Sequence, residues 1–169
     1  MDIRAADRRD VPEIAAIHVR AWRAAYAGLV DRSYLDSLSV EERAVRWREW
    51  LESPPPGMRV WVAEEDGRVL GFASTGPSRD EEAPPETAEV STIYLAPELV
   101  GTGLGRPLFA HAVEDLRDQG YVRVELWVLT TNDRARRFYE HAGWRADGGA
   151  RMDDVLGIEL HEVRYVLAL

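Results

Sequence analysis

Apolar residues in the first fifty positions recur at the three- and four-residue spacing of amphipathic helices. The first such helix begins at residues 10–13, with Pro12 in its first turn, and Gly28 closes it. A second helical stretch runs from residue 34 to residue 51, and Ser39 is the expected cap of its longer part. Three prolines and a glycine at 54–57 then end helix formation.

Beyond residue 57 the apolar residues alternate with polar ones, which is the period of β-strands. A hairpin is expected at Asp66-Gly67, and the acidic, proline-containing stretch 77–87 should be an exposed loop. Helical spacing returns at 104–118 and at 132–142. The strands predicted in this way are 3–6, 59–64, 68–74, 88–95, 122–129, 144–146 and 159–167.

The element order β-α-α-β-β-β-α-β-α-β-β indicates an α/β protein, or α+β by stricter usage. Strand 88–95, helix 104–118 and strand 122–129 should form a right-handed β-α-β unit within a mixed sheet. The 169 residues contain no repeat, low-complexity segment or linker, so one domain spanning residues 1–169 is expected.

Composition narrows the chemistry that the chain can perform. Hydrophobic residues make up 46% of the sequence, as in an ordinary globular protein, and it contains neither cysteine nor lysine. Disulfides, cysteine–zinc sites, thiol nucleophiles, lysine Schiff bases and the lysine-containing phosphate loop are therefore excluded.

The formal charge of −9 changes which partners are expected. An acidic surface repels phosphate backbones, so nucleic acid is not an expected partner, whereas cationic small molecules or basic peptides are favoured. No apolar run reaches the ~18 residues of a membrane span, and the N-terminal residues do not form a signal peptide. We expect a cytoplasmic protein that does not bind membranes and that is a monomer or a homodimer.

Three alternate glycines, Gly101, Gly103 and Gly105, separate the strand 88–95 from the helix 104–118. Glycines at such a junction let the backbone curl around an anion, with successive N–H groups pointing into one concavity at the positive end of the helix. A pyrophosphate is the natural ligand, although a tight strand-to-helix turn alone could also use these glycines. The dinucleotide-binding fingerprint needs a different spacing and an earlier position in the chain, so it is not matched.

The stretch from Ile93 to Arg106 resembles the acyl-CoA-binding motif of the GNAT superfamily of N-acetyltransferases. The segment 132–144 is similar to that family's Asn-x-x-Ala-x-x-x-Tyr-Glu-x-x-Gly-aromatic pattern, and 17–26 resembles its amino-terminal paired helices. The resemblance covers essentially the whole chain in matching order. It implies a mostly antiparallel sheet with helices on both faces, and acetyl-CoA as the acyl donor, with no metal.

The resemblance also implies individual roles. Backbone N–H groups from Gly101 to Arg106 would hold the CoA pyrophosphate, and main-chain groups of Ile93 and Leu95 would contact the pantetheine and the acyl carbonyl. Asn132 would contact the pantetheine, and Tyr139 would protonate the departing thiolate. The cofactor-binding residues implied in this way are Ile93, Tyr94, Leu95, Val100, Gly101, Thr102, Gly103, Leu104, Gly105, Arg106, Asn132, Arg134 and Ala135.

The sequence departs from the family at two positions of the glycine turn. At the position of Val100, which is uncharged, relatives usually carry Gln or Arg. At the position of Thr102, also uncharged, they often carry a basic residue. Arg106, together with Arg134 or Arg136, is therefore left to face the phosphates.

Transfer to an amine also needs a base, because an alkylammonium with a pKa of ~10.4 is only about one part in 10³ free amine at pH 7. Glu89 lies four residues before Ile93, so period-two alternation predicts that the two side chains share a face. It also matches the position at which some relatives carry a catalytic glutamate. Deprotonation through water, with Glu89 a solvated carboxylate at the strand edge, is the alternative.

Trp22 and Tyr26 lie four residues apart on one face of the first helix and are either core residues or contacts to the acceptor substrate. His18 is on the apolar face of the same helix and is expected to be packed or hydrogen-bonded rather than catalytic. The histidines have no ligand-like spacing with acidic partners, so no metal site is expected.

Together these features predict an N-acetyltransferase that moves an acetyl group from acetyl-CoA to a primary amine of a small molecule or peptide. The amine, deprotonated by Glu89 or water, would attack the thioester directly in a ternary complex. A backbone N–H near Ile93 would stabilise the oxyanion, and Tyr139 would protonate the thiolate. The alternatives are a catalytically silent acyl-CoA-binding or sensor module, and an acetyltransferase of protein N-termini or lysines.

Overall fold

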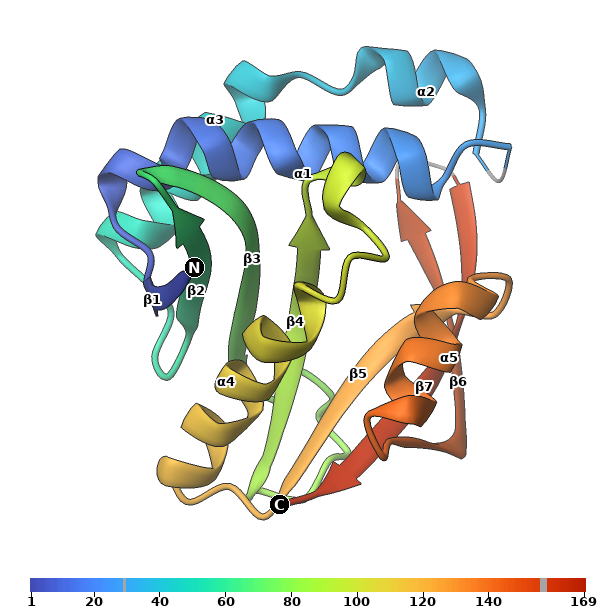
Figure 1. Cartoon of the computed structure of the whole chain (residues 1–169). Helices are drawn as coiled ribbons and strands as arrows, with labels where there is room; N and C mark the ends of the chain where they lie inside the picture. Colours follow the sequence, from blue (N-terminus) through green and yellow to red (C-terminus); the bar gives the residue numbers. More distant parts are fainter. Residues whose placement is uncertain (29, 156–157) are drawn as a thin grey trace.

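The computed structural model describes residues 1–28, 30–155 and 158–169, and its strands form one seven-stranded sheet with the order β1-β2-β3-β4-β5-β7-β6 (Figure 1). All neighbouring strands are antiparallel except β4 and β5. The elements are β1 (Asp2–Ala5), η1 (Arg8–Asp10), α1 (Val11–Ala25), α2 (Arg32–Ser37), α3 (Val40–Glu52), β2 (Arg59–Glu65), β3 (Arg68–Pro77), β4 (Thr87–Leu95), η2 (Pro97–Leu99), α4 (Gly105–Asp118), β5 (Arg123–Leu129), α5 (Asp133–His141), β6 (Arg145–Val155) and β7 (Ile158–Ala168). The predicted class and order are confirmed.

Helices pack against both faces of the sheet because the central strands are apolar on both sides. Figure 1 shows α4 and α5 in front of the sheet and α1 to α3 grouped along the top of the view. Consecutive residues of β3 enter different cores: Phe72 packs in a cluster with α1 and α3, and Ala73 packs in a cluster with α4. Strands buried on both faces carry such continuous apolar runs, which explains the sequence of β3.

The predicted second helical stretch is divided into α2 and α3, which are separated by Leu38 and Ser39. The backbone at Ser39 is extended, and its hydroxyl accepts a hydrogen bond from the Glu42 N–H at 3.2 Å, which confirms the predicted cap. In the described parts of the chain, no helix is both long and apolar enough to cross a membrane.

The parallel pair β4–β5 holds together over a short distance only. Its register joins Thr87, Ala88 and Glu89 to Arg123, Val124 and Glu125, and the later residues of the two strands are not paired. Figure 1 shows the two strands diverging from this point toward the top of the view. This divergence is the feature of the fold that creates the site.

The predicted strand 144–146 is wrong in length, because β6 continues to Val155. Asp147-Gly148-Gly149 carries turn chemistry in the sequence, yet these three residues form an irregularity between Ala146 and Ala150 within the β6–β7 pair. Gly148 supplies the positive φ of 89° that this irregularity needs, and the Asp147 carboxylate accepts bonds from Arg164 and from the Gly149 N–H. Strand pairing with β7 therefore overrides the local turn signal.

His18 is part of the core under the sheet, as predicted. Its side chain is buried, its ring stacks on Tyr94 with a centroid distance of 5.2 Å, and its Nδ1 accepts a hydrogen bond from Trp47 Nε1 at 3.1 Å. Burial lowers the pKa of His18 from 6.5 to about 3, and the charge of Arg43 adds to the decrease. The histidine is therefore neutral at physiological pH.

This low pKa predicts an acid-sensitive fold. Below pH 6.5 His18 is protonated in the unfolded chain. In the folded chain it stays neutral down to about pH 3. The free energy of unfolding should thus be unaffected by His18 above pH 6.5 and fall below it by about 1.4 kcal/mol per pH unit. His18→Gln keeps an acceptor for Trp47 and cannot be protonated. In urea unfolding at pH 7, 6 and 5, the free energy of unfolding should therefore fall less for this variant than for wild type. Equal losses in the two proteins would contradict the assignment.

Candidate active site

A cleft of about 710 Å³ lies where β4 and β5 diverge. Its walls are β4 from Val90 to Leu95, β5 from Leu126 to Leu129, the end of α1, the glycine turn, and the start of α5. A volume of this size is within the usual range for small-molecule sites. The residues predicted to bind cofactor that line it are Ile93, Tyr94, Leu95, Val100, Gly101, Gly103, Gly105, Arg106, Asn132, Arg134 and Ala135, and Tyr139 lines it with them.

The main-chain groups of Ile93 and Leu95 face the cleft. In an antiparallel pair, residues alternate between those that bond to the partner strand and those whose N–H and C=O point away from it. The N–H of Ala96 bonds to the carbonyl of Leu70 at 2.9 Å, so the next pairs along β4 alternate from there. Leu95 and Ile93 consequently point their polar groups toward β5, which has moved away. They are free to bind a ligand.

The glycine turn connects η2 to α4 at one end of the cleft. Gly101 and Gly103 have positive φ angles of 92° and 94°, which only glycine adopts readily. The Thr102 N–H bonds to the carbonyl of Leu99 at the end of η2 at 3.3 Å, and the Arg106 N–H bonds to the carbonyl of Gly103 at 3.2 Å. Among the described residues, no backbone acceptor bonds to the N–H groups of Gly101 and Gly103. The turn therefore offers unpaired donors at the N-terminus of α4, where an anion is stabilised.

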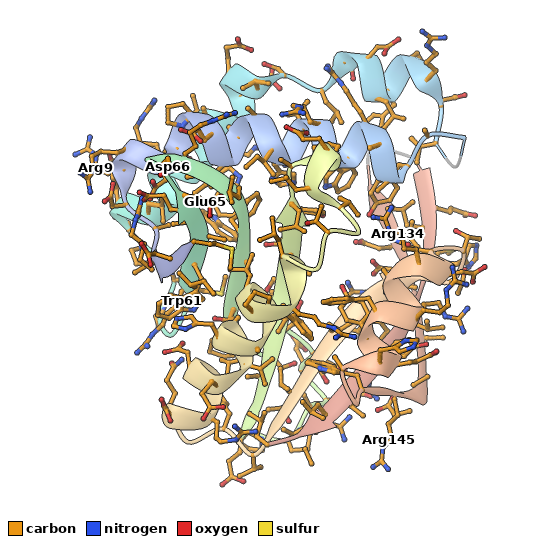
Figure 2. All side chains as sticks on the ribbon, viewed as in Figure 1. Arg9, Trp61, Glu65, Asp66, Arg134 and Arg145 are labelled. Carbon is orange, nitrogen blue, oxygen red and sulfur yellow. The ribbon has the colours of Figure 1, made fainter. Side chains whose placement is uncertain are left out.

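Charge is unevenly distributed along the cleft. The charged residues in its wall are Arg106, Arg134 and Glu162. Arg106 follows the glycine turn, and Arg134 lies at the start of α5, which is the upper end of that helix in Figure 2. Glu162 comes from β7 instead. The glycine turn, with Arg106 directly after it, is therefore suited to phosphates, while the β7 side of the cleft carries a carboxylate.

Asn132 and Tyr139 belong to the same element and face the same cleft, as their seven-residue spacing predicts. Asn132 caps α5, because its Oδ1 accepts a hydrogen bond from the Ala135 N–H at 3.1 Å. Tyr139 is buried against Phe109 and Trp144, and this burial raises the pKa of its phenol. The Tyr139 hydroxyl thus stays protonated at neutral pH, which is the state of a proton donor.

The sequence model of the Acetyltransferase (GNAT) family matches residues 14–144, which is more than half of the chain and includes this whole cleft wall except β7. The chain belongs to this family.

Individual relatives agree with the GNAT assignment. The chain is 34% identical over 131 residues to the uncharacterized N-acetyltransferase YuaI of Bacillus subtilis, covering 77% of this chain and 72% of the relative. Its structure is similar to that of the putative acetyltransferase yncA from Salmonella typhimurium with acetyl-CoA, with a TM-score of 0.74, 25% identity and coverage of 99% and 93%. PaiA N-acetyltransferase from Thermoplasma acidophilum in complex with coenzyme A has the same fold at a TM-score of 0.73, 19% identity and coverage of 99% and 98%.

The position of Glu89 differs from the face predicted for it. Ser74 of β3 pairs with Thr92 and Thr75 pairs with Val90, so Ser91 is an extra residue in β4. This bulge reverses the alternation: Ala88, Val90 and Ile93 share the core under α4, and Glu89 faces the other side of the sheet. The prediction that Glu89 and Ile93 share a face is therefore wrong.

Glu89 is also held by a neighbour. Its side chain is 3% exposed, its Oε1 pairs with Arg79 Nη2, and its Oε2 accepts from Arg79 Nε at 3.1 Å and from the Arg79 N–H at 3.2 Å. The adjacent Glu125 is fully buried, accepts from the Ser78 hydroxyl at 2.5 Å, and has Arg164 at 3.8 Å from its Oε2. The loop after β3 thus covers both carboxylates, and Glu89 is not in the cleft wall.

The other predicted residues differ in whether they line this acetyltransferase cleft. Trp22 donates from Nε1 to the Tyr94 hydroxyl at 2.9 Å and stacks on Tyr26, whereas Tyr26 itself lines the cleft. Thr102 and Leu104 are in the glycine turn but not in the wall. Arg136 bonds to Thr130 O and the Tyr165 hydroxyl, so of the two alternatives Arg134 is the arginine that lines the cleft.

The wall residues that sequence reasoning missed include Trp127 on β5 and Glu162 on β7. Alternation within 159–167 could have placed Glu162 on one face with Leu160 and Arg164. Nothing in the alternation says which side of the sheet that face is on, since this depends on the pairing of β7 between β5 and β6. In the part of the chain that the structure describes, no group of three His, Asp or Glu side chains could hold a metal ion.

Proposed function

We propose that this protein is a single-domain, cytoplasmic N-acetyltransferase that moves an acetyl group from acetyl-CoA to a primary amine of a small molecule or peptide. The amine attacks the thioester directly in a ternary complex. The observation that carries the proposal is the divergence of β4 from β5, which turns the main-chain groups of Ile93 and Leu95 into a cleft with the glycine turn at one end. Relatives with this fold bind coenzyme A or acetyl-CoA.

Acetyl-CoA has three groups that this cleft suits. Its pyrophosphate fits the unpaired N–H groups of the glycine turn, with Arg106 and Arg134 beside it. Its pantetheine arm contains amides that can pair with β4 as a further strand would, through Ile93 and Leu95. The thioester carbonyl then lies near a β4 N–H, which would stabilise the oxyanion of the tetrahedral intermediate.

Proton transfers complete the reaction. The ammonium of the acceptor loses a proton to water or, by way of water because Glu89 is not in the wall, to Glu89. The free amine forms the new C–N bond, and the nitrogen of the tetrahedral intermediate loses its second proton to water. The C–S bond then breaks, the thiolate takes a proton from Tyr139, and the Tyr139 phenolate regains a proton from water. Holding both reactants in one cleft supplies most of the rate advantage.

The first prediction tests the phosphate site. Gly103→Ala places a Cβ in open space at the turn and should weaken acetyl-CoA binding at least tenfold in calorimetry, because the pyrophosphate occupies that space. Gly120→Ala is the matched control: φ is 90° rather than 94°, its Cβ also meets nothing within 4 Å, and it lies after the other end of α4. Both variants should lose similar stability from backbone strain. Unchanged affinity in Gly103→Ala would place the phosphates elsewhere.

The second prediction concerns Tyr139. Tyr139→Phe removes only the hydroxyl, so kcat should fall ~10²-fold while acetyl-CoA affinity and Tm change little. The measurement is CoA-thiol release over a panel of amines, amino acids, polyamines and peptides. A kcat within about threefold of wild type would make Tyr139 a packing residue. No turnover of any acceptor by a wild type that binds acetyl-CoA would favour a silent acyl-CoA-binding module.

The third prediction concerns Glu89. If Glu89 accepts the proton, Glu89→Gln should lower turnover at pH 7 by ~10²–10⁴, and much of the loss should be recovered at alkaline pH where free amine is abundant. Arg79→Gln breaks the same ion pair but keeps the carboxylate, so it separates loss of stability from loss of the base. A pH–rate profile of Glu89→Gln parallel to that of wild type would leave water as the base.

A further inference from the structure

One part of the cleft wall, which we call the acceptor end, is apolar except for one carboxylate. It is formed by Ala24 and Ala25 of α1, by Tyr26 directly after α1, by Trp127 and Leu129 of β5, and by Glu162 of β7. Tyr26 packs against the cluster that contains Leu129, and Leu129 is the residue opposite Glu162 in the β5–β7 pair, so Tyr26 and Glu162 belong to the same part of the wall. An amine acceptor would meet aromatic rings and this single charge.

Strand pairing fixes the position of Glu162. It is opposite Leu129 in the β5–β7 pair and opposite Arg151 in the β6–β7 pair. Arg151 Nε donates to its Oε2 at 2.7 Å, and the Arg151 guanidinium lies 4.3 Å from the centre of the Trp127 ring. The Glu162 side chain is only 13% exposed. It is therefore a pre-positioned carboxylate beside an aromatic wall, not a solvated surface group.

Two other buried carboxylates of the sheet, Glu89 and Glu125, are paired as Glu162 is, but neither lines the cleft. Among the described wall residues Glu162 is the only acidic one. A cation that enters the acceptor end therefore has one carboxylate in the wall to reach.

We propose that Glu162 binds the ammonium group of the acceptor, and that the acceptor is a primary amine on an aromatic body without a carboxylate. This inference rests on the proposed acetyl transfer. Tyr26 supplies stacking surface for an aromatic body, together with the part of the Trp127 ring that faces the cleft and that Arg151 and Arg164 do not cover. A free α-amino acid would bring its own carboxylate next to Glu162, and the guanidinium that could offset that charge already pairs with Glu162 and covers Trp127.

Phenethylamine and phenylalanine are the probes, because they differ only in the carboxylate. Turnover is measured by CoA-thiol release, and binding is measured by calorimetry with protein saturated in CoA. Wild type should acetylate phenethylamine with a kcat/KM at least tenfold above that for phenylalanine, and bind it with the same preference.

Two substitutions separate the role of Glu162 from a merely structural one. Glu162→Gln removes a charge-assisted hydrogen bond, so KM and Kd for phenethylamine should rise ~10–100-fold with kcat within about fivefold. The preference of this variant for phenethylamine over phenylalanine should shrink or invert, because Arg151, without its carboxylate partner, is free to pair with the carboxylate of phenylalanine. Arg151→Met keeps the apolar stem and frees Glu162, so phenethylamine binding should be kept or improved. Glu159→Gln, an exposed residue on the opposite face of β7, is the control and should match wild type.

The outcomes distinguish this inference from the function on which it rests. If amino acids or other carboxylate-bearing amines are acetylated and phenethylamine is not, the acceptor assignment is overturned and the acetyltransferase stands. If phenethylamine is a substrate and Glu162→Gln leaves its KM and Kd unchanged, the role of Glu162 is overturned. If no acceptor of the panel is turned over and acetyl-CoA does not bind, both proposals are overturned.

Discussion

The site depends on the point at which two parallel strands stop pairing. After three residue pairs, β4 keeps its bonds to β3 while β5 turns toward β7 and leaves it. Every N–H and C=O that β4 would have shared with β5 then needs another partner, because buried backbone groups left unpaired are costly. A ligand with amides along an extended arm can supply those partners. The divergence therefore both opens the cleft and gives its floor a chemical preference for a strand-like ligand.

A single extra residue determines which groups of β4 face which reactant. Ser91 shifts the alternation, so Val90 and Ile93 share the α4 side and Glu89 faces the opposite side. On that side the carboxylates of Glu89 and Glu125 are covered by the loop from Ser78 to Asp80. Arginine suits Glu89, because the planar guanidinium of Arg79 binds both oxygens of this carboxylate at once. A buried pair of this kind positions the strand ends rather than adding much stability.

The sequence was sufficient for the parts of the protein that local chemistry determines. Helical spacing predicted α1, α4 and α5, the Ser39 cap was correct, and the glycines marked the turn before α4 because only they readily adopt its positive φ angles. The sequence-based prediction failed where the structure depends on pairing between strands that are distant in the chain. The bulge at Ser91, the extension of β6 past Gly148 and the position of Glu162 in the wall all depend on register with another strand. Alternation within one strand cannot reveal that register.

A chain with a formal charge of −9 can still favour a polyanionic donor, because the groups that meet the phosphates act at short range. At physiological ionic strength charges more than about 8 Å apart through solvent are largely screened. The unpaired N–H groups of Gly101 and Gly103, the α4 N-terminus, and Arg106 and Arg134 therefore outweigh the distant acidic surface. Glu162 lines the same cleft from β7, opposite Leu129 of β5. In the proposed reaction, the cleft would hold a phosphate at the glycine turn and an ammonium at Glu162, with the thioester between them.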